Sequence, residues 1–315
     1  MFLIISPCGQ FFPIFASAKF KLEMEKNGVI IGIGEVLFDL LPEGKQLGGA
    51  PANFAYHATC LGCNGVAVSA VGCDSLGDEI VELLTTNGVN HQTARVDAPT
   101  GTVRVTLDER GIPCYEICEG VAWDKLQLND EVFALAKSCD AICFGTLAQR
   151  SEMSRKAICD LIDAIPVERN ALVIYDINLR QNYYSKELIE ASLNRCNILK
   201  INDEEFSTIA PMLNFVADDF EVGARELIER YGLKMVVVTC GEKGSLVVTK
   251  NEVSKLETPK VEVVDTVGAG DSFTAALCVG LLRGKEIREV HRKAVEVAAF
   301  VCSNAGAMPS YEKWL

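Results

Sequence analysis

Residues 265–273 carry the strongest chemical pattern in the chain, since they place small residues between two aspartates. They read Asp-Thr-Val-Gly-Ala-Gly-Asp-Ser-Phe, follow an expected strand at 261–264 and precede an expected apolar helix at 274–282. Small residues at such a junction leave backbone amides exposed, and the helix dipole favours negative charge there. The run Gly268, Ala269, Gly270 therefore predicts a phosphate site.

Asp271 falls in the first turn of that expected helix. A carboxylate beside a bound phosphate is repulsive unless a metal intervenes or the carboxylate has a chemical role. Phosphoryl transfer supplies such a role, because the attacking hydroxyl needs a base while amides and Mg²⁺ hold the transferring group. The alternative is that Asp271 only caps the helix, since acidic residues are common at helix starts.

A second pattern, Gly-Gly-Ala-Pro-Ala-Asn at 48–53, puts an amide side chain just after a glycine pair. Close backbone approach at Gly48 and Gly49, with the donor and acceptor of Asn53, suits a polyol ligand. Asp39, near the first strand, could accept hydrogen bonds from two hydroxyls. A tight turn with an asparagine cap and a solvated aspartate is the alternative interpretation.

Asn202 and Glu205 stand three residues apart after an expected strand at 198–201. On one face of a helix, a carboxylate and an amide can hold a hydrated Mg²⁺. The same residues also form an ordinary helix start with a capping box, and the local pattern favours that interpretation.

The elements that must position these residues alternate along the chain. Short β-branched runs and stretches of helical period follow one another, which is the βαβ rhythm of a mostly parallel sheet with helices on its faces. Two segments, about 36–48 and 96–122, break the rhythm with strand-like pieces and turns such as Glu109-Arg110-Gly111. They predict antiparallel hairpins that form a small lid over the strand ends, where ligands of open α/β sheets lie. We expect one domain over 24–315.

Composition limits the partners. The 315 residues have a net charge of −13, which disfavours nucleic acid and anionic lipid. The 13 cysteines fall mostly in apolar runs and indicate a reducing, cytoplasmic setting; Cys60 and Cys63 lack the further ligands of a zinc site.

Residues 1–23 are interpreted as a misassigned or non-native extension, and no later segment predicts a membrane span. Gly32-Ile33-Gly34 does not predict a dinucleotide site, because Leu37 replaces the third glycine.

Taken together, the patterns resemble the PfkB (ribokinase-like) carbohydrate kinase family over nearly all of residues 29–311. Both family signatures are present, at 48–72 and at 265–277, and the family motif Asn-x-x-Glu falls on Asn202 and Glu205, which reverses the local preference for a cap. The resemblance implies a ribokinase-like three-layer α/β sandwich with a mostly parallel central sheet and a small β-strand lid.

The resemblance also implies roles. Asp271 would be the catalytic base, and the amides of Gly268, Ala269 and Gly270 would form the anion hole for the γ-phosphate of ATP. Other family positions that this chain matches are, for the sugar, Asp39, Gly48, Gly49 and Asn53; for the nucleotide with its Mg²⁺, Thr239, Gly241, Asn202 and Glu205; and for a monovalent cation such as K⁺, Asp265, Val267, Gly306 and Ser310. Val295 departs from the family, because many relatives have an asparagine there.

Within the family, residues 34–44, 99–124 and 175–184 resemble fructokinases most. Arg104 from the lid, and Asn178 and Arg180 after a strand, are then expected at the sugar or the phosphoryl group, although an arginine there could also form a surface ion pair. The implied activity is ATP-dependent phosphorylation of the fructose 6-hydroxyl. Alternatives are a kinase of the same fold for ribose, 2-keto-3-deoxygluconate or a nucleoside, or a catalytically silent sugar-binding regulator. A homodimer through the lid is also expected.

Overall fold

The structure is a computed structural model that describes residues 28–41, 44–107 and 113–312. The expected extension at 1–23 and the expected turn at 109–111 lie outside the described residues.

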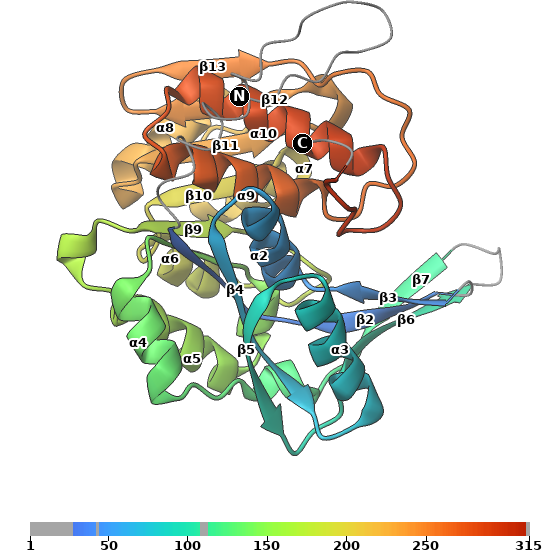
Figure 1. The fold of residues 1–315 in the computed structure, drawn as a ribbon. Helices are drawn as coiled ribbons and strands as arrows, with labels where there is room; N and C mark the ends of the chain where they lie inside the picture. Colours follow the sequence, from blue (N-terminus) through green and yellow to red (C-terminus); the bar gives the residue numbers. More distant parts are fainter. Residues whose placement is uncertain (1–27, 42–43, 108–112, 313–315) are drawn as a thin grey trace, which may run out of the picture.

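A nine-stranded sheet forms the centre of the protein, in the order β13-β12-β11-β10-β9-β8-β1-β4-β5 (Figure 1). The strands from β5 to β11 in this order pair in parallel, and β12 and β13 pair antiparallel at one edge. Their bounds are β1 Val29–Ile33, β4 Asn64–Gly72, β5 Asn90–Val96, β8 Ala141–Phe144, β9 Leu172–Asp176, β10 Ile198–Asn202, β11 Met235–Thr239, β12 Ser245–Thr249 and β13 Val253–Leu256.

Helices cover both faces of this sheet, because alternate strand residues point into two separate apolar cores. Ile31, Ile142 and Val236 pack in one core, and Ile30, Cys143 and Val237 pack in the other. The first core is covered by α4 Asp130–Ser138, α5 Glu152–Asp163, α6 Lys186–Leu193, α7 Asp203–Leu213 and α8 Phe220–Tyr231; the second by α2 Ala50–Cys60, α3 Ser75–Thr86, α9 Ala269–Leu282 and α10 Ile287–Cys302. The predicted three-layer α/β sandwich is thus confirmed.

Short 3₁₀ turns complete the connections, at η1 Ala122–Lys125, η2 Leu147–Arg150, η3 Val167–Arg169 and η4 Gly241–Lys243.

A second sheet of four strands projects from this body, in the order β3-β2-β6-β7 (Figure 1). Its strands are β2 Leu37–Leu41, β3 Gly44–Gly48, β6 Gly101–Leu107 and β7 Pro113–Ile117. The two outer pairs are antiparallel, as predicted, but they are joined by a parallel pairing of β2 with β6. The two hairpins therefore form one continuous small sheet.

The expected strand at 261–264 is wrong. Residues 257–264 form no strand, and the side chains of Val263 and Val264 are 60% and 59% exposed. The β-branched run there meets no neighbouring strand, whereas the hairpin of β12 and β13 occupies the edge of the sheet. The motif at 265–273 consequently follows a loop rather than a strand.

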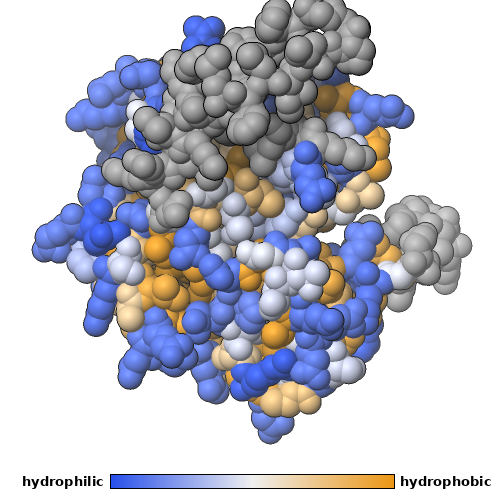
Figure 2. Space-filling view, viewed as in Figure 1, coloured by the Kyte–Doolittle hydropathy of each residue, from blue (hydrophilic) through white to orange (hydrophobic). Residues whose placement is uncertain are grey.

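Among the coloured residues in Figure 2, hydrophilic side chains alternate with hydrophobic areas on the visible face. No helix within the described ranges has the length and apolar character needed to span a membrane.

Chain order places a functional site at the carboxyl ends of the parallel strands. Within this sheet the chain runs from β1 outward through β4 to β5 and then continues at β8 on the opposite side of β1, so the strand order reverses between β1 and β8. Crevices form outside the strand ends at such a switch point. The segments that follow β1, β8, β9 and β10 meet there, together with the start of α2.

Candidate functional site

The first turn of α9 presents free backbone amides, as the glycine pattern predicts. Gly268 is the N-cap of the helix, with a left-handed φ of 77° that favours glycine. Among the described residues no hydrogen-bond acceptor faces the amides of Gly268 and Gly270, whereas the amide of Ala269 donates weakly to Thr266. Amides at a helix start are suited to an anion.

Asp271 lies inside this turn and is not the residue that caps the helix. Its Oδ2 accepts a hydrogen bond of 2.7 Å from Nδ2 of Asn53 on α2. Burial and the neighbouring charge of Asp176 raise the pKa of Asp271 to about 6, although Asn53, Lys200 and Arg180 act in the opposite direction. A carboxylate with such a pKa can accept a proton near neutral pH.

A buried ion pair supports the start of α9 from below, and the sequence patterns did not single it out. Nζ of Lys200 donates to Oδ1 of Asp176 at 3.0 Å, and Oγ1 of Thr274 donates to Oδ2 at 2.9 Å. A Cβ atom at Gly270 would lie only 3.0 Å from the same ammonium. Burial lowers the pKa of Lys200, but the charges of Asp176, Glu205 and Asp271 outweigh this and raise it, so the lysine stays charged. The available signal in the sequence was a charged residue within or at the end of an apolar strand, Lys200 in β10 and Asp176 in β9.

Four of the residues predicted for the sugar, Asp39, Gly48, Gly49 and Asn53, lie on β2, at the end of β3 and in the first turn of α2. Asn53 is buried, and its Oδ1 has no hydrogen-bond partner among the described residues. A Cβ atom at Gly48 would lie 2.8 Å from Oδ2 of Asp39. At Gly49 the φ is 116° and a Cβ atom would meet the carbonyl oxygen of Glu35 at 2.5 Å, so only glycine fits this turn into α2.

Glu35 is a further polar residue that sequence reasoning missed. It lies two residues after the end of β1 and is 3% exposed, and its Oε2 has no hydrogen-bond partner within the described chain. Burial, with a smaller contribution from the charge of Asp271, raises its pKa to about 7, although backbone hydrogen bonds and the charge of Arg180 act in the opposite direction. Its position two residues after an apolar strand was the signal that could have found it.

Arg180 lies in the loop after β9 and is exposed. Its charge acts on Glu35, Asp39 and Asp271, where it opposes the effect of burial and lowers the pKa of each carboxyl group. Asn178, two residues earlier, has a left-handed φ of 43° and shapes this loop.

Arg104 is separated from the other predicted sugar residues. It pairs in register with Leu40, whereas Asp39 pairs with Val103. Because side chains alternate across a sheet, Arg104 lies on the face opposite to Asp39. The structure does not bring Arg104 to the carboxyl groups around Arg180.

The residues predicted for the nucleotide lie together at the ends of β10 and β11. Asn202 pairs in register with Thr239. Gly241 lies two residues after Thr239 and begins the 3₁₀ turn η4. Asn202 and Glu205 form a full capping box: Oδ1 of Asn202 accepts from the amide of Glu205 at 2.8 Å, and Oε2 of Glu205 accepts from the amide of Asn202 at 2.9 Å. The local interpretation as a helix cap is therefore what the geometry shows.

Each of these side-chain oxygens already accepts one backbone hydrogen bond, so neither residue presents an open set of ligands. Each oxygen retains a second lone pair, which can accept a hydrogen bond from the water shell of a Mg²⁺ ion. The pair fits a hydrated Mg²⁺ through its water molecules. Within the described part of the chain no cluster of three or more His, Cys, Asp or Glu residues is arranged for direct metal binding.

Asp265 connects two of the positions expected for a monovalent cation. Its Oδ1 accepts from the amide of Val267 and its Oδ2 from that of Gly306, both at 3.0 Å. No contact links Ser310 to this pair among the described residues; its Oγ accepts instead from the amide of Glu312. Val295, where many relatives have asparagine, lies on α10 and is buried in the second apolar core.

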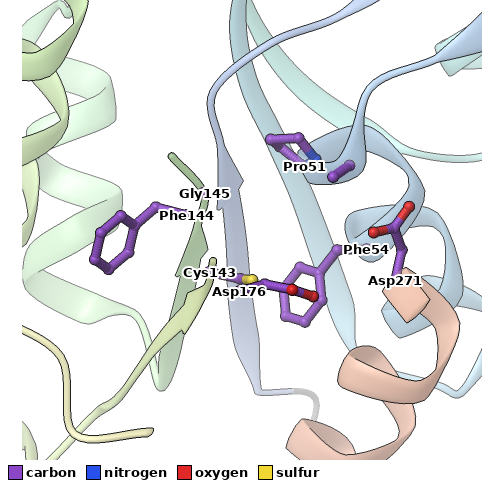
Figure 3. A pocket seen from close by; sticks show the side chains of 8 residues that line it. Pro51, Phe54, Cys143, Phe144, Gly145, Asp176 and Asp271 are labelled. Carbon is purple, nitrogen blue, oxygen red and sulfur yellow. The ribbon is translucent and has the colours of Figure 1, made fainter. Parts of the chain in front are cut away.

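A small pocket lies beside Asp271 and Asp176. It is lined by residues of α2, of the β8 end and of the β9 and α9 ends: Ala50, Pro51, Phe54, Cys143, Phe144, Gly145, Asp176 and Asp271. Figure 3 shows Asp271, Pro51 and Phe54 on one side of this space and the strand that carries Cys143 to Gly145 on the other. The arrangement can hold a hydroxyl against Asp271 with an anion at the start of α9.

Comparisons with known proteins point to one kind of chemistry. The family described as pfkB family carbohydrate kinase matches residues 43–314. A fructokinase of Solanum tuberosum is 31% identical over 304 residues, covering 91% of this chain and 91% of the relative. The crystal structure of an uncharacterized sugar kinase from Pyrococcus horikoshii is similar with a TM-score of 0.76 and 27% identity, over 89% of this chain and 93% of that one. For fructokinase from Vibrio cholerae, with fructose, ADP and calcium ion bound, the TM-score is 0.75 and the identity 25%, over 90% and 94% of the two chains.

Proposed function

The chain belongs to the pfkB family of carbohydrate kinases, and from this premise we propose that it transfers the γ-phosphoryl group of ATP to the 6-hydroxyl of fructose. The observation that supports this most is the position of Asp271, which is held by Asn53 beside the free amides of the α9 start. A base and an anion site are then adjacent, as phosphoryl transfer requires.

In this proposal Asp271 accepts the proton of the attacking hydroxyl, and the amides of Gly268, Ala269 and Gly270 bind the oxygens of the transferring group. The ammonium of Lys200, beneath Gly270, adds positive charge to this end of the site. Mg²⁺ supplies further neutralisation of the nucleotide phosphates, with Asn202 and Glu205 facing its water shell. On the opposite side, Asp39, Asn53 and Arg180 orient the sugar.

Fructose is proposed as the acceptor because relatives named fructokinases match over most of the chain. Ribose, 2-keto-3-deoxygluconate and a nucleoside are the alternative acceptors for the same chemistry. Nothing in the comparisons supports a catalytically silent regulator.

The proposed function is tested by an ADP-release assay on the full chain with ATP, Mg²⁺ and K⁺, offered fructose, ribose, 2-keto-3-deoxygluconate, glucose or adenosine. We expect turnover with fructose. Asp271→Asn should lower kcat by about two to four orders of magnitude while fructose affinity stays within a few-fold, because only proton acceptance is removed. Turnover with another acceptor alone would replace fructose, and an active Asp271→Asn variant would contradict the mechanism.

We further propose that the four-stranded sheet acts as a lid over the sugar and that its outer strands, β3 and β7, pair with a second copy of the chain. Pairing would cover their unpaired backbone groups. Light scattering at several protein concentrations should give the mass of a dimer; a monomer at all concentrations would contradict this.

The free cysteines of the described chain support a reducing, cytoplasmic setting.

A further inference from the structure

The carboxylate of Glu205 connects two elements rather than one. Its Oε2 accepts from the amide of Asn202, which closes the capping box of α7, and its Oε1 accepts from the amide of Leu179 at 2.9 Å. Leu179 lies in the loop after β9, 26 positions away in the sequence. Glu205 is 7% exposed, and both hydrogen bonds are partly buried.

The loop that receives this contact has an unfavourable backbone conformation. Asn178 and Gln181 have φ values of 43° and 47°, in the left-handed region. This region is unfavourable for residues other than glycine, and such residues persist there only where their surroundings hold them. The amide of Leu179, which binds Glu205, lies between these two residues.

Arg180 lies between these two residues, so the loop conformation sets the direction of its side chain. It follows Leu179 directly, and its Nη1 donates to the carbonyl oxygen of Leu179 at 2.9 Å. The guanidinium is close enough to Asp39 and Asp271 for its charge to lower their pKa values. An arginine at this place can bind an acceptor hydroxyl or a phosphoryl oxygen.

We propose that Glu205 is a positioning residue for the acceptor side of the site: by fixing the amide of Leu179 it holds Arg180 toward the sugar. The inference rests on the proposed function for the identity of the acceptor. It adds a second role to a residue expected only at the nucleotide. It also links the two parts of the site: a ligand at the start of α7 that changes the contact of Glu205 with Leu179 would change sugar affinity, and the sugar would change the affinity for that ligand by the same factor.

The test measures fructose binding by calorimetry in buffer free of nucleotide and divalent metal. Glu205→Gln has the same shape but only one acceptor oxygen, so it loses one of the two amide contacts. We expect its fructose affinity to fall about tenfold. Glu204→Gln is the matched control, because Glu204 is the exposed neighbour on the same turn and should bind fructose like the wild type.

Arg180→Met, and the double variant with Glu205→Gln, complete the cycle. Arg180→Met should weaken fructose binding by a similar factor, and the double variant should be no weaker than the weaker single variant. A role confined to metal or nucleotide would leave binding by Glu205→Gln unchanged under these conditions. That result, or additive losses in the double variant, would overturn the proposal.

Hydrogen exchange over residues 177–184 reads the contact without any ligand. Exchange should be faster in Glu205→Gln than in the wild type and unchanged in Glu204→Gln, while exchange in the core strands β8 and β9 stays the same in all three. Equal exchange would overturn the proposal even if the protein binds no fructose. A wild type without fructose affinity but with the expected exchange would reject the proposed acceptor and retain the role of Glu205.

Discussion

At the scale of single residues, the proton affinity of Asp271 depends on its contact with Asn53. Burial and the charge of Asp176 raise the pKa of Asp271 to about 6, and the hydrogen bond from Asn53 keeps this pKa from rising further. A base works only when deprotonated, so kcat/KM should fall as pH drops below about 6. Asn53→Ala removes the stabilising donor, and the acid limb should then move to higher pH. Rate profiles between pH 5 and 8 measure the shift.

The control for this prediction is Asn90→Ala. Asn90 also donates a side-chain hydrogen bond, to Oδ1 of Asn64, but does so outside the site. Its acid limb should coincide with that of the wild type. An Asn53→Ala profile that keeps the wild-type limb would mean that a group other than Asp271 controls the acid side.

At the scale of elements, the entry into α9 is set by Gly268. Its φ of 77° lies in the left-handed region that favours glycine. A Cβ atom there would also lie only 2.8 Å from each of three atoms of Ala307. Gly268→Ala should therefore destabilise the protein by more than the ~1–2 kcal/mol that the φ alone costs, and kcat should fall because the amides shift. Urea unfolding and steady-state rates measure the two effects.

Gly284→Ala separates these two contributions. Gly284 follows the same helix with a φ of 66° and has open space where a Cβ atom would stand. It should lose only the stability that the backbone conformation accounts for, with kcat unchanged. Equal losses in the two variants would show that the contact with Ala307 has no effect.

At the scale of the whole molecule, two buried histidines connect distant segments. His57 joins α2 to Ala307 and Tyr311, and His291 joins α10 to β12 and β13 through two serines. Burial lowers both pKa values to about 4. The unfolded chain binds their protons near pH 6.5, so each histidine makes the protein less stable as pH falls from about 6.5 to 4, by on the order of 1.4 kcal/mol per pH unit.

His291→Gln isolates one of these contributions, because glutamine can still bond to the serines but does not titrate. The difference in unfolding free energy between variant and wild type should change in favour of the variant as pH falls through this range. Comparison of the two chains is needed because the raised pKa values of Glu35 and Asp271 act in the opposite direction. The measurement is urea unfolding of both chains at pH 4.5, 5.5 and 6.5. A difference in unfolding free energy that stays the same at all three pH values would contradict the prediction.

Much of the fold is predictable because its signals are local. The alternation of β-branched runs with helical stretches indicates a mostly parallel sheet, and the capping box at Asn202 and Glu205 is contained within four residues. The strand expected at 261–264 failed for the opposite reason. A β-branched run becomes a strand only beside a partner, and partners are chosen by the whole chain.

The sequence by itself determined the small-residue turn that starts α9 and the aspartate that follows it, because a helix start is encoded in adjacent residues. Only the tertiary structure decided what those residues meet. The partner of Asp271 lies 218 positions away, and the contact of Glu205 with Leu179 joins two separate elements. Burial and charge pairing arise when distant segments pack together, so spacing along the chain does not record them.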